Sequence, residues 1–174
     1  MKFCGACGEA VQLQTVLGDS VLRHVCGSCK TIHYVNPKLI VGCLPVYEGS
    51  VLLCKRAIEP ALGLWTLPSG FMEIGESVEQ GALRETWEEA HAEVEIVRLF
   101  SEYSLPHIGQ VYLLFLARLK NLNFSAGQET LETRLYSKEE VPWDQIAFSA
   151  VRFALEKYFS DPSTITTHLG TFSK

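Results

Sequence analysis

The sequence contains no long apolar run and no stripe of basic residues, and these absences exclude two classes of protein. Its longest apolar stretches, such as residues 111–117, are far shorter than the roughly 20 residues that cross a bilayer. The formal net charge is −5, which does not favour a general affinity for nucleic acid. We therefore expect neither a membrane protein nor a nucleic-acid-binding module.

The sequence also lacks repeats and low-complexity segments, and a cysteine follows so soon after Met1 that we expect no signal peptide. Six cysteines would suggest disulfides in a small secreted protein, but without a secretion signal we expect reduced thiols and a cytoplasmic location. With 47% hydrophobic and 20% charged residues among 174, the composition fits one globular domain and a small appendage.

Four of the six cysteines form two pairs, Cys4-x2-Cys7 and Cys26-x2-Cys29, in the first 35 residues. Two residues between cysteines let one tight turn aim both sulfurs at one ion, and two such turns complete a tetrahedron. The spacing therefore predicts a structural zinc ribbon over residues 1–35. Its role stays open among folding this segment, binding a partner and forming a homodimer interface. Cys43 and Cys54 lie in apolar strand patterns and are expected in the core.

Residues 36–174 alternate between strand and helix patterns after the break at Asn36-Pro37. A helix should start after Gly75, with Ser77 as its cap and Gln80 completing a capping box, and should pack Leu83, Trp87 and Ala90 on a sheet. This order predicts an α/β/α sandwich with a mixed sheet. The expected strands cover 39–47, 51–56, 94–103, 110–119 and 131–136, and a second helix covers 148–159.

Three acidic residues of the first helix, Glu85, Glu88 and Glu89, are spaced to share one helix face. Like charges this close destabilise a helix unless a cation lies among them. Carboxylate oxygens are the ligands that magnesium and manganese prefer, and these ions serve phosphate chemistry. The helix therefore predicts a metal-dependent enzyme with a phosphorylated substrate.

The run Gly70-x5-Glu76-x7-Arg84-Glu85-x2-Glu88-Glu89 resembles the Nudix box, G-x5-E-x7-R-E-U-x-E-E-x-G-U, where U is a bulky aliphatic residue. Three positions depart from that pattern, namely Thr86, His91 and Ala92. His91 stands where a left-handed helix cap usually requires glycine, and histidine is one of the few residues that tolerate this conformation. We interpret His91 as a strained cap and not as a general base.

The resemblance implies hydrolysis of a nucleoside diphosphate linked to another group. It implies that the Gly70 carbonyl and the three glutamates bind magnesium. It also implies that Arg84 holds a carboxylate in place and that Glu76 supports the loop. The general base stays open between Glu85, Glu129 and Glu132, of which Glu129 is the better candidate in the later loop.

Outside the box, the chain resembles zinc-ribbon Nudix hydrolases that include plant chloroplast-type FAD pyrophosphohydrolases. The shared motifs are His33-Tyr34-x-Asn36-Pro37-Lys38, residues 53–56 and residues 63–68. The resemblance implies cleavage of FAD or ADP-ribose to AMP plus FMN or ribose 5-phosphate, so the partner is a small dinucleotide. NADH is a weaker candidate because residues 101–107 lack the Ser-Gln-Pro-Trp-Pro-Phe-Pro-like stretch of NADH pyrophosphatases. A different class, a nucleotide-sensing regulator, is disfavoured because every catalytic glutamate is present.

Four further residues are candidates for substrate contact. Trp65, Phe71 and Tyr103 are expected either to stack on a flavin or adenine ring or to lie in the core. Arg56 is expected either to contact a phosphate or to end its strand in a salt bridge.

Overall fold

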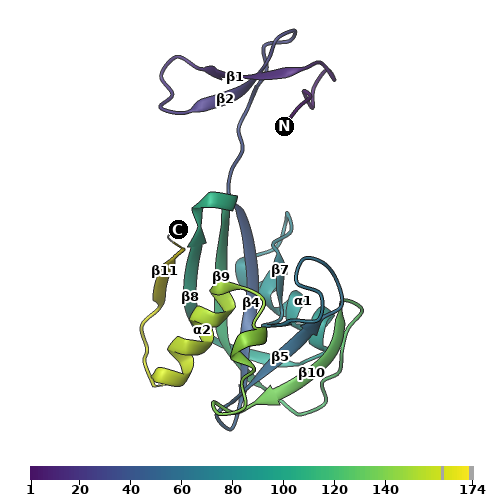
Figure 1. The fold of residues 1–174 in the computed structure, drawn as a ribbon, viewed down its shortest axis with the longest axis vertical. Coiled ribbons are helices and arrows are strands. Elements are labelled where there is room, and N and C mark those ends of the chain that lie inside the picture. The colour runs from purple at the N-terminus through teal and green to yellow at the C-terminus, as the bar shows by residue number, and fades with distance from the viewer. Residues whose placement is uncertain (162, 173–174) are drawn as a thin grey trace. The chain divides into compact units, whose positions relative to one another are not determined.

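The computed structural model describes residues 1–161 and 163–172. The chain forms two compact units, Met1–Asn36 and Pro37–Lys174, each with its own sheet (Figure 1). The boundary lies one residue beyond the one that the sequence suggests. None of the described helices has the length and apolar character needed to cross a membrane.

The first unit is a three-stranded antiparallel sheet, β1 (Val11–Thr15), β2 (Leu22–Cys26) and β3 (Ile32–His33), in that order. Most of its side chains are exposed, and its buried apolar residues are Cys4, Val25 and Cys26. A segment this short cannot build a substantial hydrophobic core, so another source of stability is needed.

The second unit is an eight-stranded mixed sheet in the order β10-β5-β4-β9-β8-β11, with β6 paired to β5 and β7 to β4. The β4–β9 and β8–β11 pairs are parallel and the others are antiparallel. Two short 3-10 turns cover Pro106–Ile108 and Trp143–Gln145. The elements are β4 (Lys38–Tyr47), β5 (Ser50–Arg56), β6 (Trp65–Thr66), β7 (Ser69–Phe71), α1 (Val78–Ala90), β8 (Val94–Leu105), β9 (Gln110–Leu119), β10 (Thr130–Tyr136), α2 (Ser149–Ser160) and β11 (His168–Thr171).

The two helices cover opposite faces of this sheet, because successive side chains of a strand point to opposite sides. Cys43 of β4 lies in the same core cluster as Ala82 of α1, whereas the next residue, Leu44, clusters with Val151 of α2. In Figure 1, α2 lies in front of the sheet. The predicted α/β/α sandwich with a mixed sheet is confirmed.

Helix α1 begins and ends as its sequence predicts. The Ser77 hydroxyl accepts a hydrogen bond from the Gln80 N–H (3.2 Å), and the Gln80 side chain accepts one from the Ser77 N–H (2.8 Å). His91 ends the helix in the left-handed conformation (φ 43°), and its N–H donates to the Trp87 carbonyl. The capping box and the left-handed cap are both confirmed.

The face that α1 turns to the sheet differs in part from the prediction. Ala90 is buried as expected, but Leu83 is 40% exposed and Trp87 is 52% exposed. Apart from Glu89, the buried positions carry small or medium-sized residues, including Gly81, and a Cβ on Gly81 would lie 2.8 Å from Val41 Cγ2. The helix lies close to the sheet at Gly81, and Leu83 and Trp87 are not among its buried residues, so the prediction for these two is wrong.

Candidate active site

Arg84 is the centre of a network of four ionised side chains on α1 and the loop before it. Its Nε and Nη2 donate to the two carboxylate oxygens of Glu76 at 3.0 and 2.8 Å, while Nη1 donates to Glu85 (2.7 Å) and Glu88 (3.1 Å). The hydrogen bonds from Arg84 lower the pKa of Glu76 to about 2. Such a bidentate pair fixes the loop that precedes α1, as expected for Glu76.

Gly70 of β7 lies directly against Glu85. A Cβ at position 70 would lie 2.3 Å from Glu85 Oε2, so a larger residue there would displace the Glu85 carboxylate. The neighbouring carbonyl, that of Phe71, accepts a hydrogen bond from Arg84 Nη2 (3.2 Å). The strand and the helix thus present backbone and carboxylate oxygens side by side.

Glu89 is the most buried of the three helix glutamates, with 8% of its surface exposed. Its Oε2 accepts a hydrogen bond from the Ser69 N–H (3.0 Å). Burial is the main cause that raises its pKa to about 8, and the charges of Glu85 and Glu129 add to the effect. Burial also raises the pKa of Glu85. A cation bound beside these two partly desolvated carboxylates would favour their charged forms and lower both pKa values again.

The three glutamates line one cavity but do not cluster tightly. Across residues 1–161 and 163–172, the four ribbon cysteines are the one group of three or more acidic, histidine or cysteine side chains whose ligand atoms lie within 4.8 Å of one another. Glu85 and Glu88 turn to Arg84, and Glu89 turns to Ser69. The donor set, hard carboxylate and carbonyl oxygens, fits magnesium or manganese held by Glu85, Glu88, Glu89 and the Gly70 carbonyl.

The cavity has a volume of about 870 Å³, within the usual range for a small-molecule site. Its lining includes six glutamates and two arginines, so its own charge is negative. The glutamates are Glu59, Glu73, Glu85, Glu88, Glu89 and Glu129, and the arginines are Arg56 and Arg84.

The loop that carries Glu129 is attached to the end of α1. The Ser125 N–H donates to the Ala90 carbonyl (2.9 Å), and the Gly127 N–H donates to the Glu89 carbonyl (3.0 Å). Glu129 therefore lies at the cavity, whereas Glu132 is exposed on β10 and is not among the described residues that line it. The geometry favours Glu129 over Glu132 as the loop base, and Glu85 remains an alternative.

The four candidate substrate residues divide between cavity and core. Phe71 is half exposed and lines the cavity. Arg56 also lines it, donating to the Pro60 carbonyl (2.8 Å), and forms no ion pair with any described residue. Trp65 is 4% exposed and Tyr103 is 8% exposed, and neither is among the described lining residues. The geometry gives no support to ring stacking by Trp65 or Tyr103.

The cavity also contains residues that sequence reasoning missed. Tyr112 of β9 and Phe148, the residue that precedes α2, belong to strand and helix patterns that indicate only a core role. Trp87 and His91 line the cavity at the C-terminal end of α1. The exposure of Trp87 had no signal in the sequence, because large apolar residues on a helix usually face inward.

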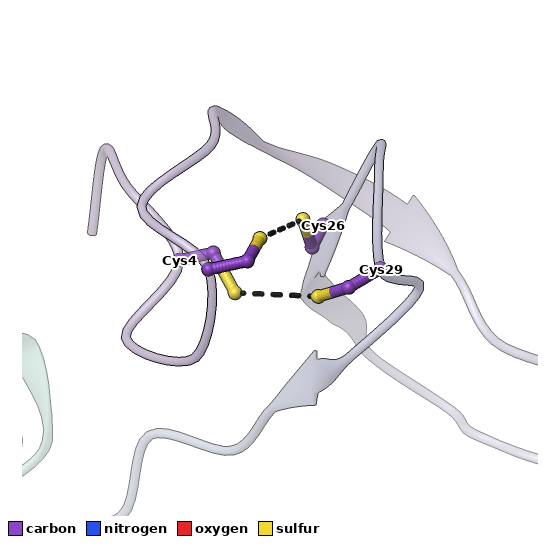
Figure 2. A group of neighbouring side chains, drawn as sticks. Cys4, Cys26 and Cys29 are labelled. Carbon is purple, nitrogen blue, oxygen red and sulfur yellow. Dashed lines mark hydrogen bonds between the residues drawn. The ribbon is translucent and has the colours of Figure 1, made fainter.

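The four ribbon cysteines come together as their spacing predicts (Figure 2). The Cys4 and Cys29 sulfurs are 3.6 Å apart, and those of Cys7 and Cys26 are 3.5 Å apart. Sulfurs in a zinc tetrahedron with 2.3 Å bonds lie about 3.8 Å apart, so the cluster fits zinc. His33 Nε2 lies 3.2 Å from Cys4 Sγ, where an N–H would donate to a thiolate.

Comparison with known proteins agrees with both units. A family profile described as "NUDIX domain" matches residues 36–154, and one described as "Nudix N-terminal" matches residues 2–35. A protein from Photobacterium profundum named "NAD-capped RNA hydrolase NudC" is 30% identical over 139 residues, covering 79% of this chain and 50% of its own length. The chain thus spans about half the length of the curated relatives it matches.

Solved structures extend the similarity to the whole chain. A NUDIX hydrolase from Nitrosomonas europaea is 52% identical, with a TM-score of 0.94 and full coverage of both chains. An ADP-ribose pyrophosphatase from Streptococcus suis shares the fold, with a TM-score of 0.64 and 22% identity over 79% of this chain and all of that one. Together with the box residues gathered at the cavity, these matches show that the chain belongs to the Nudix hydrolase family, with a zinc-ribbon segment of the Nudix N-terminal type.

Proposed function

We propose that the protein hydrolyses the pyrophosphate bond of a small dinucleotide with the help of magnesium or manganese. The observation that carries this proposal is the convergence on one cavity of the Nudix-box groups and Glu129. The box groups are Gly70, Arg84, Glu85, Glu88 and Glu89.

In this reaction the metal supplies charge neutralisation at the pyrophosphate and makes a bound water more acidic. Arg84 holds Glu85 and Glu88 in place through Nη1. Glu129 or Glu85 accepts the proton of the attacking water, and Arg56 contacts a phosphate.

The substrate class that we propose comprises FAD, ADP-ribose and NADH. The sequence motifs favour FAD and ADP-ribose. NADH is included because the name of the bacterial relatives refers to NAD. The same name supports a second candidate, hydrolysis of NAD-capped RNA, which conflicts with the expectation of no nucleic-acid partner. The lining of six glutamates and two arginines favours the smaller substrates, because a long polyanion gains little from such a cavity.

The test is a substrate panel of FAD, ADP-ribose, NADH and an NAD-capped RNA, each with magnesium and with manganese. Glu88→Gln should lower kcat by about 100-fold or more, because loss of one charged ligand removes several kcal/mol of transition-state stabilisation. The thermal unfolding temperature should stay close to that of the wild type, since Glu88 is mostly exposed.

Glu132→Gln is the matched control, because Glu132 lies on β10 outside the lining. Its activity should remain within about twofold of the wild type. Glu129→Gln then tests the base: a fall in kcat comparable to that of Glu88→Gln supports Glu129, and an unchanged kcat assigns the role to Glu85. Full turnover by Glu88→Gln would contradict the metal assignment, and turnover of the RNA alone would favour the second candidate.

A further inference from the structure

Trp87 is a large apolar side chain whose position is not explained by the folding of α1. It lies between Glu85 and Glu88 in sequence, yet 52% of its surface is exposed. Its neighbours Thr86 and Ala90 are the residues that face the sheet. A half-exposed indole at the edge of a cavity presents a wide flat surface for a ligand.

His91 restrains the indole from one side. The two rings meet edge to face, with centroids 5.6 Å apart and planes at 70°. His91 is itself fixed by its left-handed backbone and by the contact of its Nδ1 with the Ser125 hydroxyl at 3.0 Å. Both side chains line the cavity that contains Glu88. We call this pair the Trp87–His91 wall.

The wall differs from two other aromatic side chains of the cavity, Phe71 and Phe148. The Phe71 ring has Lys38 Nζ 5.1 Å from its centroid, and the Phe148 ring has the Arg56 guanidinium at the same distance. Among the described residues, no cation lies over Trp87. About half of its surface is exposed, and it lies within one helical turn of the carboxylates proposed to bind the metal.

We propose that Trp87, restrained by His91, stacks on the planar heteroaromatic ring of one nucleoside 5′-phosphate half of the substrate. This inference rests on the proposed function for its location, since a base lies one ribose away from the phosphate that the metal binds. In this proposal Trp87 recognises the ring of the substrate and not its pyrophosphate. Adenine, flavin and nicotinamide all have the flat surface that stacking requires.

The test measures binding of reaction products, so it does not depend on turnover. Calorimetric titrations with AMP, FMN and NMN, and with ribose 5-phosphate as a ring-free probe, are made in magnesium. Trp87→Ala should weaken binding of at least one ring-bearing probe by about 5- to 30-fold, the size expected for loss of one stacked ring. Binding of ribose 5-phosphate should not change, and Trp87→Phe should retain most of the affinity.

Leu83→Ala is the matched control, because Leu83 lies one turn earlier on the same exposed face of α1 and is absent from the described lining. Its affinities should equal those of the wild type. Equal affinity of Trp87→Ala and wild type for every ring-bearing probe would overturn the proposal, as would failure of the wild type to prefer any of them over ribose 5-phosphate. A changed oligomeric state with unchanged affinity would overturn it too, and would assign Trp87 to a protein interface. Ring-dependent binding without hydrolysis of any panel substrate would refute the proposed function alone.

Discussion

The guanidinium of Arg84 contacts both the loop before α1 and two glutamates of the helix. Its Nε and Nη2 fix Glu76 and so the loop before α1, and its Nη1 reaches Glu85 and Glu88. A lysine at this position has a single charged nitrogen and cannot present the same planar fork. One side chain therefore positions both the loop before α1 and the carboxylates of Glu85 and Glu88.

The Glu76–Arg84 pair gives a pH-dependent stability whose direction follows from the pKa. The folded state holds the pKa of Glu76 at about 2, below its ordinary value of 4.5. The stabilisation is therefore complete above pH 4.5 and is lost as the pH falls toward 2. Glu76→Gln should be less stable than wild type at neutral pH, and the difference should shrink over that window.

Urea unfolding of both proteins at a series of pH values measures this difference directly. Protonation of the ribbon cysteines affects both proteins alike and cancels in the comparison. A difference that stays constant between pH 5 and about pH 2 would contradict the role of the ion pair.

At the scale of elements, the 121–129 loop lies against the backbone at the end of α1. A Cβ on Gly127 would lie 1.7 Å from the Glu88 carbonyl oxygen. Two backbone hydrogen bonds from Ser125 and Gly127 hold the loop there. The loop that carries Glu129 can adopt this position because residue 127 has no side chain.

Gly127→Ala should therefore displace the loop and cost about 1–3 kcal/mol of stability or more, since a backbone oxygen cannot move aside as a side chain does. Activity should fall with it, because Glu129 moves away from the cavity. Gly27→Ala is the control, since a Cβ on Gly27 would meet nothing within 4 Å. Urea unfolding together with kcat measures both effects, and a Gly127→Ala protein with wild-type stability would contradict the contact.

Hydrophobic periodicity and capping residues in the sequence predicted the longer strands and both helices of the second unit. The strands β4, β5, β8, β9 and β10 and both helices were expected within two residues of their observed ends. The capping box of α1 was predicted because Ser77 and Gln80 are only three residues apart. The strands β6, β7 and β11 were missed, because each has four residues or fewer and is formed by pairing with a distant strand.

The site was predicted most completely where one segment carries it, and outside the box only Arg56 and Glu129 were expected there. Arg84 and the helix glutamates follow from their spacing, but Tyr112 and Phe148 reach the cavity from elements distant in sequence. Trp65 and Tyr103 were candidates for stacking because they are aromatic, and the fold buries both. Residue type alone does not separate a core ring from a cavity ring.

At the scale of the whole molecule, the two units depend on different kinds of stabilisation. The second unit has large apolar clusters on both faces of its sheet, whereas the first has few buried residues beside its cysteines. Structural zinc sites supply folding free energy that a small segment otherwise lacks. The ribbon should therefore unfold when zinc is lost while the second unit stays folded.

Cys4→Ser should lower the zinc content below one ion per chain and destabilise residues 1–36, because serine is a poor zinc ligand. The rate of pyrophosphate hydrolysis per folded molecule should change little. Metal analysis and limited proteolysis measure the two expectations. Cys43→Ala is the control, since Cys43 is a buried thiol in the second unit and should leave zinc content unchanged.

The attachment of the 121–129 loop to α1 has a consequence for amide hydrogen exchange. The N–H groups of Ser125 and Gly127 belong to an irregular loop, yet their acceptors are the Ala90 and Glu89 carbonyls at the end of α1. Both amides should exchange with deuterium only when the loop detaches from this end of the helix, and therefore more slowly than the amides of an unattached surface loop. The protection of these two amides would then report how often Glu89 and Glu129 separate.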